Sequence, residues 1–280
     1  KGRLENYIYP FMKKISIAKV QYPFVKAKIK PIYLNKTGKG GTETARRCIF
    51  ILNMVMYHAL DNGIIIKNPL ARLLKEFPKQ KVENVSAITD TEEFGKFAYE
   101  MDSLPHLSGL ALRLIMHTVI REGAMLSMKW SSINWKKKQM IYRDTKVDRD
   151  HIVPLSKQSI EILKKIQEHT AHKEYIFHSS ASKSGHISPQ AMLKQIRNRG
   201  WSGDKVTVHG LRASFQTICE EEELETNVAI LEMCLNHKVK GALSDVYRRG
   251  KFIKQREVLM QKWSDYIDEL KRNYIKESII

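Results

Sequence analysis

The sequence predicts a mainly α-helical fold with a small antiparallel β-sheet, divided into two domains. Apolar residues recur at three- and four-residue steps through most of the chain, as they do on the buried face of a helix. Only the segments 139–143 and 151–155 resemble a pair of strands. With 280 residues, the chain is long enough to build two separate cores.

The net charge of +18 is concentrated in the first part of the chain. Residues 1–82 hold 17 Lys and Arg against 4 Asp and Glu, whereas the remaining 198 residues hold 31 against 26. A basic surface binds nucleic acid by releasing its counterions, so we predict a nucleic-acid partner. The alternatives are a basic protein that binds acidic lipid and a soluble basic protein that binds neither lipid nor nucleic acid.

Composition excludes several other classes of protein. No apolar run approaches the roughly 20 residues of a membrane span, and no signal peptide is visible. Three widely spaced cysteines lack CxxC spacing and are expected to be reduced, packed side chains in a cytoplasmic protein. The histidines show no ligand-like spacing with one another or with cysteine, so we expect no metal site.

The first predicted domain, 1–83, is helical and basic. Residues 1–35 form a helical or mixed start that ends in a basic, proline-punctuated stretch, 26–31. After the glycines of 38–41, Thr42 is expected to cap a helix that continues to about Leu60 and stops near Gly63. One face of this helix is apolar: Ala45, Ile49, Leu52, Met56 and Ala59.

Arg46 and Arg47 lie off that apolar face, which makes them candidates for contacts with DNA phosphates. For each of the two residues taken singly, a solvated surface arginine without a role in binding is an equally good interpretation. Residues 78–82 resemble a linker, and the boundary is expected near residue 84, which gives domains 1–83 and 84–280.

The second predicted domain begins with a capping-box pattern at 89–92 that opens a helix. A further helix over 106–119 faces a core with its leucines and presents Arg121 at its C-terminal end. The two strands follow, joined by a polar loop that carries Lys146, and Pro154 indicates an edge strand. Further helices are expected from Ser156, after Ser188, and through most of the chain beyond Thr207.

Six polar residues of this domain form a set suited to phosphate chemistry. Arginine and lysine hold phosphate oxygens, histidine moves protons, and tyrosine supplies a nucleophile. His209 and Arg212 are three residues apart on a predicted helix and can share a face. An H-x-x-R pair alone is a weak signal for a phosphate site, and the other four polar residues strengthen it. The six are Arg121, Lys146, His209, Arg212, His237 and Tyr247.

Over nearly its whole length the chain resembles the tyrosine recombinases, or phage integrases, most strongly the branch of genomic islands and satellite phages. The resemblance rests on short motifs in family order. They are Arg3-Leu-Glu-Asn6, Thr44-Ala-Arg-Arg47, Ala87-Ile-Thr-Asp90, His151-Ile-Val-Pro-Leu-Ser156, His209-Gly-Leu-Arg-Ala-Ser-Phe215, Leu235-Asn-His237, Val246-Tyr-Arg-Arg249 and Arg256-Glu-Val-Leu-Met-Gln-Lys-Trp-Ser-Asp-Tyr266.

The resemblance implies a role for each of the six residues. Arg121 and Arg212 would hold the scissile phosphate, and Lys146 would protonate the departing 5′-oxygen. His209 would assist proton transfer or bind the phosphate, and His237 would donate a hydrogen bond to the transition state. Tyr247 would attack, giving a 3′-phosphotyrosine without metal or cofactor.

The resemblance also implies a two-domain, C-shaped DNA clamp with the tyrosine recombinase catalytic fold. Its partners would be double-stranded attachment-site DNA and three further protomers in a tetramer, with a monomer possible without DNA. A host DNA-bending protein and an excision factor are further expectations, as is a place on the bacterial nucleoid. The chain starts at Lys1, so we expect it to be a fragment that lacks an N-terminal arm-binding domain.

The chain departs from the family pattern at one position. The family commonly has a glutamate three residues after the first arginine, where this chain has Ala124. Glu122, or a carboxylate from elsewhere, is expected to replace it.

Three alternatives to an integrase stay open. The first is a type IB topoisomerase or telomere resolvase, and the second is a degenerate integrase that binds DNA without cutting it. The third, a basic scaffold with no role at DNA, is remote.

The apolar stripe Met260, Trp263 and Tyr266 is expected to pack in the core or, as the family's last helix often does, on a neighbouring subunit.

Overall fold

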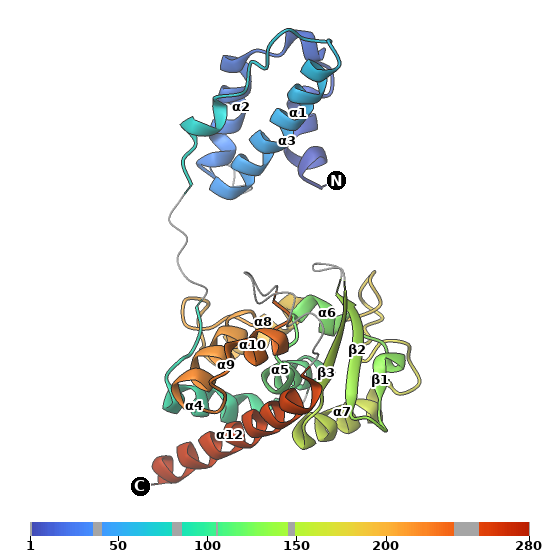
Figure 1. The fold of residues 1–280 in the computed structure, drawn as a ribbon, viewed down its shortest axis with the longest axis vertical. Helices are drawn as coiled ribbons and strands as arrows, with labels where there is room; N and C mark the ends of the chain where they lie inside the picture. The colour runs from blue at the N-terminus through green and yellow to red at the C-terminus, as the bar shows by residue number, and fades with distance from the viewer. Residues whose placement is uncertain are drawn as a thin grey trace. The chain divides into compact units, whose positions relative to one another are not determined.

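The protein consists of two compact units, Lys1–Glu83 and Asn84–Ile280, in a computed structural model (Figure 1). The structure describes residues 2–35, 41–79, 86–104, 106–144, 149–237 and 252–279. Each unit has its own hydrophobic core.

Unit 1 is built from helices. Its elements are η1 (Leu4–Ile8), α1 (Tyr9–Met12), η2 (Ile17–Lys19), α2 (Tyr22–Tyr33), α3 (Thr42–Asp61) and η3 (Leu73–Glu76). The basic stretch 26–31 belongs to α2, and its Pro31 lies inside this helix. It stands in the last turn of α2, so the hydrogen bond that its missing N–H cannot donate is one of the last in the helix.

Helix α3 has the predicted apolar face, whose five residues are all buried. Its start differs from the prediction, because Thr42 is the first helical residue and Gly41 holds the cap position at φ +112° without a side-chain hydrogen bond. At the other end Gly63, at φ +70°, follows the cap and takes the left-handed conformation that glycine adopts without strain.

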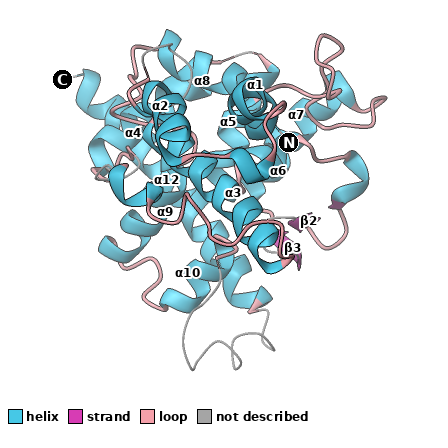
Figure 2. Ribbon diagram, turned by 90° about the horizontal axis from the view of Figure 1, so that it is seen from above, coloured by secondary structure: helices cyan, strands magenta, loops and turns pink. Residues whose placement is uncertain are grey.

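Unit 2 is also mainly helical, as Figure 2 shows. Its helices are α4 (Thr91–Asp102), α5 (Leu107–Thr118), α6 (Glu122–Leu126), η4 (Trp130–Ser132), α7 (Lys157–Thr170), α8 (Pro189–Asn198), α9 (Gly210–Glu221), α10 (Val228–Cys234) and α12 (Ile253–Ile279). Asp90 caps α4 by accepting from the Glu93 N–H at 2.8 Å, so the capping side chain is one residue later than the capping-box pattern suggests. Ser156 caps α7 as its position predicts.

The sheet has three antiparallel strands in the order β1 (Ile133–Asn134), β2 (Gln139–Asp144) and β3 (Arg149–Pro154). Pro154 pairs with Gln139 on the edge strand, as predicted. The register places Asp144 opposite Arg149, at the end of the sheet where the two long strands join. The sheet thereby presents two charged residues to the segments beside it.

Helix α12 packs on α4 within unit 2, and Figure 1 shows it crossing that unit from β3 to α4. Gly95 of α4 makes the contact possible, because a Cβ there would meet the Leu270 carbonyl oxygen at 2.7 Å. Met260 and Trp263 are fully buried, so this part of the stripe belongs to the core. A contact with a neighbouring subunit stays a prediction.

The three cysteines are unpaired and buried. In the described part of the chain, no helix combines the length and the apolar character needed to cross a membrane.

Candidate active site

Arg121 lies in a tight bend between two helices. Helix α5 ends at Thr118, and Val119 adopts φ +48°, a left-handed conformation that is strained for a β-branched residue. Arg121 then occupies the N-cap position of α6. The bend brings the Val119 carbonyl to the Arg212 side chain of α9, and the Arg121 side chain to the Asn236 carbonyl that follows α10.

Arg212 joins this bend to the end of α10. Its two terminal nitrogens donate to the carbonyl oxygens of Val119 and Leu235, and the residue is only 5% exposed. Burial, together with the positive charge of Arg121, lowers the pKa of Arg212 to about 10. The guanidinium stays charged at neutral pH, so the fold holds a largely dehydrated cation beside a second one.

His237 completes this cluster. Its Nε2 lies 3.3 Å from Arg212 Nη2, and its Nδ1 lies 2.8 Å from Glu232 Oε2. A carboxylate only accepts, so Nδ1 carries a proton and the neutral ring faces Arg212 with a lone pair on Nε2. Burial lowers the pKa of His237, Glu232 opposes that shift, and Arg212 and Arg121 add to it.

Arg121 is held by a second set of contacts. Its Nη1 donates to Asp144 Oδ2 at 2.7 Å, and its Nη2 donates to the Asn236 carbonyl oxygen at 3.2 Å. The Asn236 amide donates to the same Asp144 oxygen at 2.8 Å. Arg149 donates to Asn236 Oδ1 at 2.8 Å and to the His237 carbonyl oxygen at 3.1 Å.

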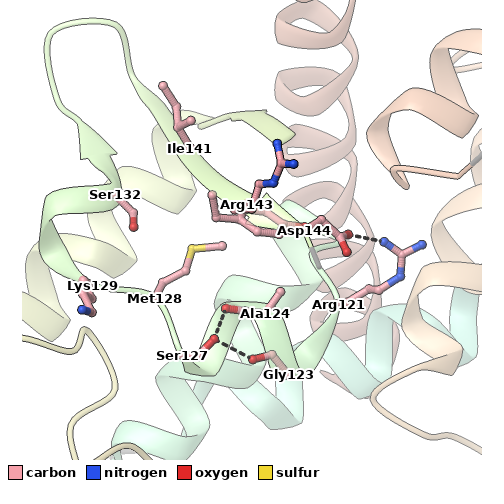
Figure 3. A pocket seen from close by; sticks show the side chains of 11 residues that line it. Arg121, Gly123, Ala124, Ser127, Met128, Lys129, Ser132, Ile141, Arg143 and Asp144 are labelled. Carbon is pink, nitrogen blue, oxygen red and sulfur yellow. Dashed lines mark hydrogen bonds and ion pairs between the residues drawn. The ribbon is translucent and has the colours of Figure 1, made fainter. Parts of the chain in front are cut away.

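An open pocket of about 640 Å³ borders Arg121 and Asp144 (Figure 3). Ala124 and Tyr142 also line it. Burial and the charge of Asp144 raise the pKa of Tyr142 to about 12, so this phenol resists ionisation although three arginines oppose the shift.

The structure therefore brings together Arg121, Arg212 and His237. His209 occupies the N-cap of α9, one turn before Arg212, and is exposed. The glycine after it is sterically required, because a Cβ on Gly210 would meet the Ser86 carbonyl oxygen at 1.9 Å.

Lys146 and Tyr247 lie outside the described residues. In unit 1, Arg46 donates to the Phe77 carbonyl oxygen, and Arg47 forms an exposed ion pair with Glu43 at 2.7 Å. Both arginines thus have partners within unit 1, and their contacts with DNA stay a prediction.

Sequence reasoning missed the carboxylates and the amide around the arginines. It assigned Asp144 to the polar loop, although Asp144 ends β2 and its side chain is only 5% exposed. Asn236 adopts φ +51°, which asparagine tolerates well, and its side chain connects Asp144 to Arg149. The carboxylate on Arg121 is that of Asp144, and among the described residues no ion pair joins the Arg121 and Glu122 side chains.

We expect Glu232→Gln to lower the pKa of His237 further. The substitution removes the negative charge that favours the protonated ring, while burial and the two arginines continue to oppose it. NMR titration of the His237 ring measures the shift directly. Glu220→Gln, on the exposed face of α9, is the matched control and should leave the titration unchanged. An equal or higher pKa in Glu232→Gln would contradict the assignment of Nδ1 to Glu232.

Two family models match the chain. The phage integrase family matches residues 81–252, and the phage integrase central domain matches residues 1–76. The prophage integrase IntA of Escherichia coli K12 is 27% identical, over 94% of this chain and 63% of the relative. The integrase of Enterobacteria phage P4 is 23% identical, over 99% of this chain and 66% of the relative. The chain thus spans less than two thirds of the length of either relative.

The fold matches that of a solved integrase. A lambda integrase tetramer bound to a Holliday junction superposes with a TM-score of 0.65 and 21% identity, over 86% of this chain and 70% of that one. This likeness shows the tyrosine recombinase fold, mostly helical with a small antiparallel sheet, as the sequence predicts. Because the family model covers more than half of its residues, the chain belongs to the phage integrase family of tyrosine recombinases.

Proposed function

We propose that the protein is a site-specific DNA recombinase that integrates and excises a mobile genetic element through a covalent 3′-phosphotyrosine. One observation carries the proposal: Arg121, Arg212 and His237 converge from segments far apart in the sequence. Two guanidinium groups and an imidazole at one place, beside an open pocket, suit a tetrahedral phosphate better than any uncharged ligand.

In this mechanism Arg121 and Arg212 bind the non-bridging oxygens of the scissile phosphate. Those oxygens gain negative charge as phosphorus becomes pentacoordinate, so fixed cations stabilise the transition state more than the ground state. His237 donates from Nε2 only when its ring is protonated, because Nδ1 already donates to Glu232. An approaching phosphate favours that form.

In the cleavage step the Tyr247 oxygen attacks phosphorus and the bond to the 5′-oxygen breaks. Tyr247 gives up its proton with help from His209, and Lys146 delivers a proton to the leaving oxygen. The products are a 3′-phosphotyrosine and a 5′-hydroxyl. A 5′-hydroxyl of a partner duplex then attacks the phosphotyrosine and releases Tyr247, so strands are exchanged without ATP.

Unit 1 serves in this proposal as the core-binding domain of a two-domain clamp, and unit 2 as the catalytic domain. The excess of Lys and Arg in residues 1–82 supplies affinity for the DNA backbone, with Arg46 and Arg47 as candidate contacts. The tetramer on a Holliday junction seen for lambda integrase supports a tetramer here. A host DNA-bending protein, an excision factor and a location on the nucleoid belong to the same proposal.

We expect the purified chain to form a detergent-stable adduct with nicked attachment-site DNA, and to form it equally in EDTA. The duplex carries the junction between the element and its host chromosome, with a nick placed so that the cleaved fragment diffuses away. Cations of the chain supply the charge stabilisation, so chelation should change the rate by less than about twofold. Denaturing electrophoresis detects the adduct.

The same assay separates the alternatives. An adduct followed by joining to a second duplex supports recombination. Relaxation of supercoiled plasmid without strand transfer would identify a topoisomerase. Binding without any adduct would identify a degenerate integrase and overturn the proposal.

A further inference from the structure

Asp144 and Asn236 hold the Arg121 side chain. Asp144 supplies the carboxylate that Arg121 contacts, through Nη1 and Oδ2 at 2.7 Å. Both groups are shielded from water, with side-chain exposures of 17% for Arg121 and 5% for Asp144. At such burial an ion pair keeps its geometry, and removal of one partner leaves an uncompensated charge.

Asp144 is itself fixed from three directions. Strand β2 fixes its backbone, Arg121 binds one oxygen, and the Asn236 amide donates to the same oxygen. Asn236 is held in turn by Arg149 of β3. Because Arg121 also donates to the Asn236 carbonyl, its guanidinium is bound by both Asp144 and Asn236. These two residues are themselves joined by a hydrogen bond. Two of the five N–H groups of Arg121 are used this way, and the other three have no partner among the described residues, so they can meet a phosphate.

Asp144 also reduces the electrostatic repulsion between Arg121 and Arg212. Arg121 and Arg212 repel each other, and burial prevents water from screening that repulsion. The Asp144 carboxylate, in contact with Arg121, offsets this repulsion, because it raises the pKa of Arg212 whereas Arg121 lowers it. Ala124, which lines the same pocket one turn after Arg121, has no charge to contribute.

We propose that Asp144, held by Asn236, is the positioning residue that aligns Arg121 for the scissile phosphate and supplies the carboxylate that Ala124 does not. This inference rests on the proposed recombinase function. Asp144 does not touch the reacting atoms and acts through Arg121.

The test compares cleavage of nicked attachment-site DNA by the native chain and by Asp144→Asn under single-turnover conditions. The amide is nearly isosteric with the carboxylate but carries no charge. We expect adduct formation to slow by about 10- to 100-fold, the usual effect of losing a group that orients a functional residue. DNA affinity should change by less than about threefold, since the backbone contacts of unit 1 remain.

Two variants make the test specific. Asp144→Asn combined with Ala124→Glu should regain at least about half of the lost rate on a logarithmic scale, because it returns a carboxylate to the pocket beside Arg121. Asp150→Asn is the matched control, since Asp150 lies in the same sheet and pairs with Arg143 at 3.5 Å in an exposed position. It should cleave like the native chain.

A second substrate separates Arg121 from Lys146, which is two residues from Asp144. A DNA with sulfur in place of the bridging 5′-oxygen leaves as a thiolate and needs no acid, because a thiol ionises near pH 8.5. A defect that acts through Arg121 persists on this substrate. A defect that disappears on it would act through Lys146 and overturn the proposal.

Asn236→Gly keeps the test decisive if Asp144→Asn fails to fold. Glycine accepts φ +51° without strain, so the variant keeps the carbonyl that Arg121 contacts and removes the side chain that donates to Asp144 and accepts from Arg149. It should slow cleavage by about 3- to 10-fold at unchanged DNA affinity.

The failures are distinguishable. If the native chain forms no adduct, the proposed function fails. If the native chain cleaves and Asp144→Asn or Asn236→Gly matches its rate, or if Ala124→Glu rescues nothing, only the role of Asp144 is overturned.

Discussion

Tyr247→Phe is expected to abolish the covalent adduct with nicked attachment-site DNA. Phenylalanine keeps the ring and removes the oxygen that would attack phosphorus, so the rate should fall by at least about 10⁴-fold, equivalent to roughly 5.5 kcal/mol of transition-state stabilisation. Affinity for the same DNA should stay within about twofold, because the two arginines proposed to bind the phosphate, Arg121 and Arg212, are unchanged. Gel-shift titration and denaturing electrophoresis measure the two quantities side by side.

Two further tyrosines control for the loss of a phenol. Tyr99→Phe alters an exposed ring that packs on Tyr274, and it should leave the adduct unchanged. Tyr142 lines the pocket beside Arg121, but burial raises its pKa to about 12, and its phenol is a poor nucleophile. An adduct that persisted in Tyr247→Phe and vanished in Tyr142→Phe would transfer the nucleophile to Tyr142.

The helices were predictable because their signals are local. The apolar face of α3 and the serine cap of α7 depend on residues a few positions apart, and the structure has both where the sequence places them. Pro31 shows the limit of such signals. Whether a proline ends a helix or sits in its last turn depends on what the neighbouring segments pack against, and packing is not a local property.

The same limit explains what sequence reasoning found and missed at the site. Arg121, Arg212 and His237 stand out because their residue types suit phosphate chemistry. Asp144 and Glu232 do not, since surface carboxylates are common and only the fold brings these two within 2.7 Å and 2.8 Å of their partners. The residues that hold the arginines and His237 come from distant segments, here β2, β3 and the end of α10. No spacing rule in the sequence predicts that these segments meet.

Trp263→Ala is expected to destabilise unit 2 by about 3–5 kcal/mol, the usual cost of truncating a large buried aromatic side chain. The indole is fully buried between Phe94 of α4 and Phe215 of α9, at ring distances of 5.5 Å and 5.3 Å. Its N–H donates to the Met116 carbonyl oxygen of α5 at 2.7 Å. One side chain of α12 therefore contacts three other helices of the unit.

Chemical denaturation followed by circular dichroism measures this effect, provided that the unfolding of unit 2 is resolved from that of unit 1. Val258→Ala, at an exposed position of the same helix, is the matched control and should stay within about 0.5 kcal/mol of the native protein. Trp263→Phe separates packing from hydrogen bonding: it retains most of the ring contacts, so it should cost less than alanine, with about 1–3 kcal/mol arising from the unpaired Met116 carbonyl. A loss below about 1 kcal/mol in Trp263→Ala would mean that α12 is not anchored in its own unit. The stripe around Trp263 would then be available to a neighbouring subunit, and the core of unit 2 would have to be stable without it.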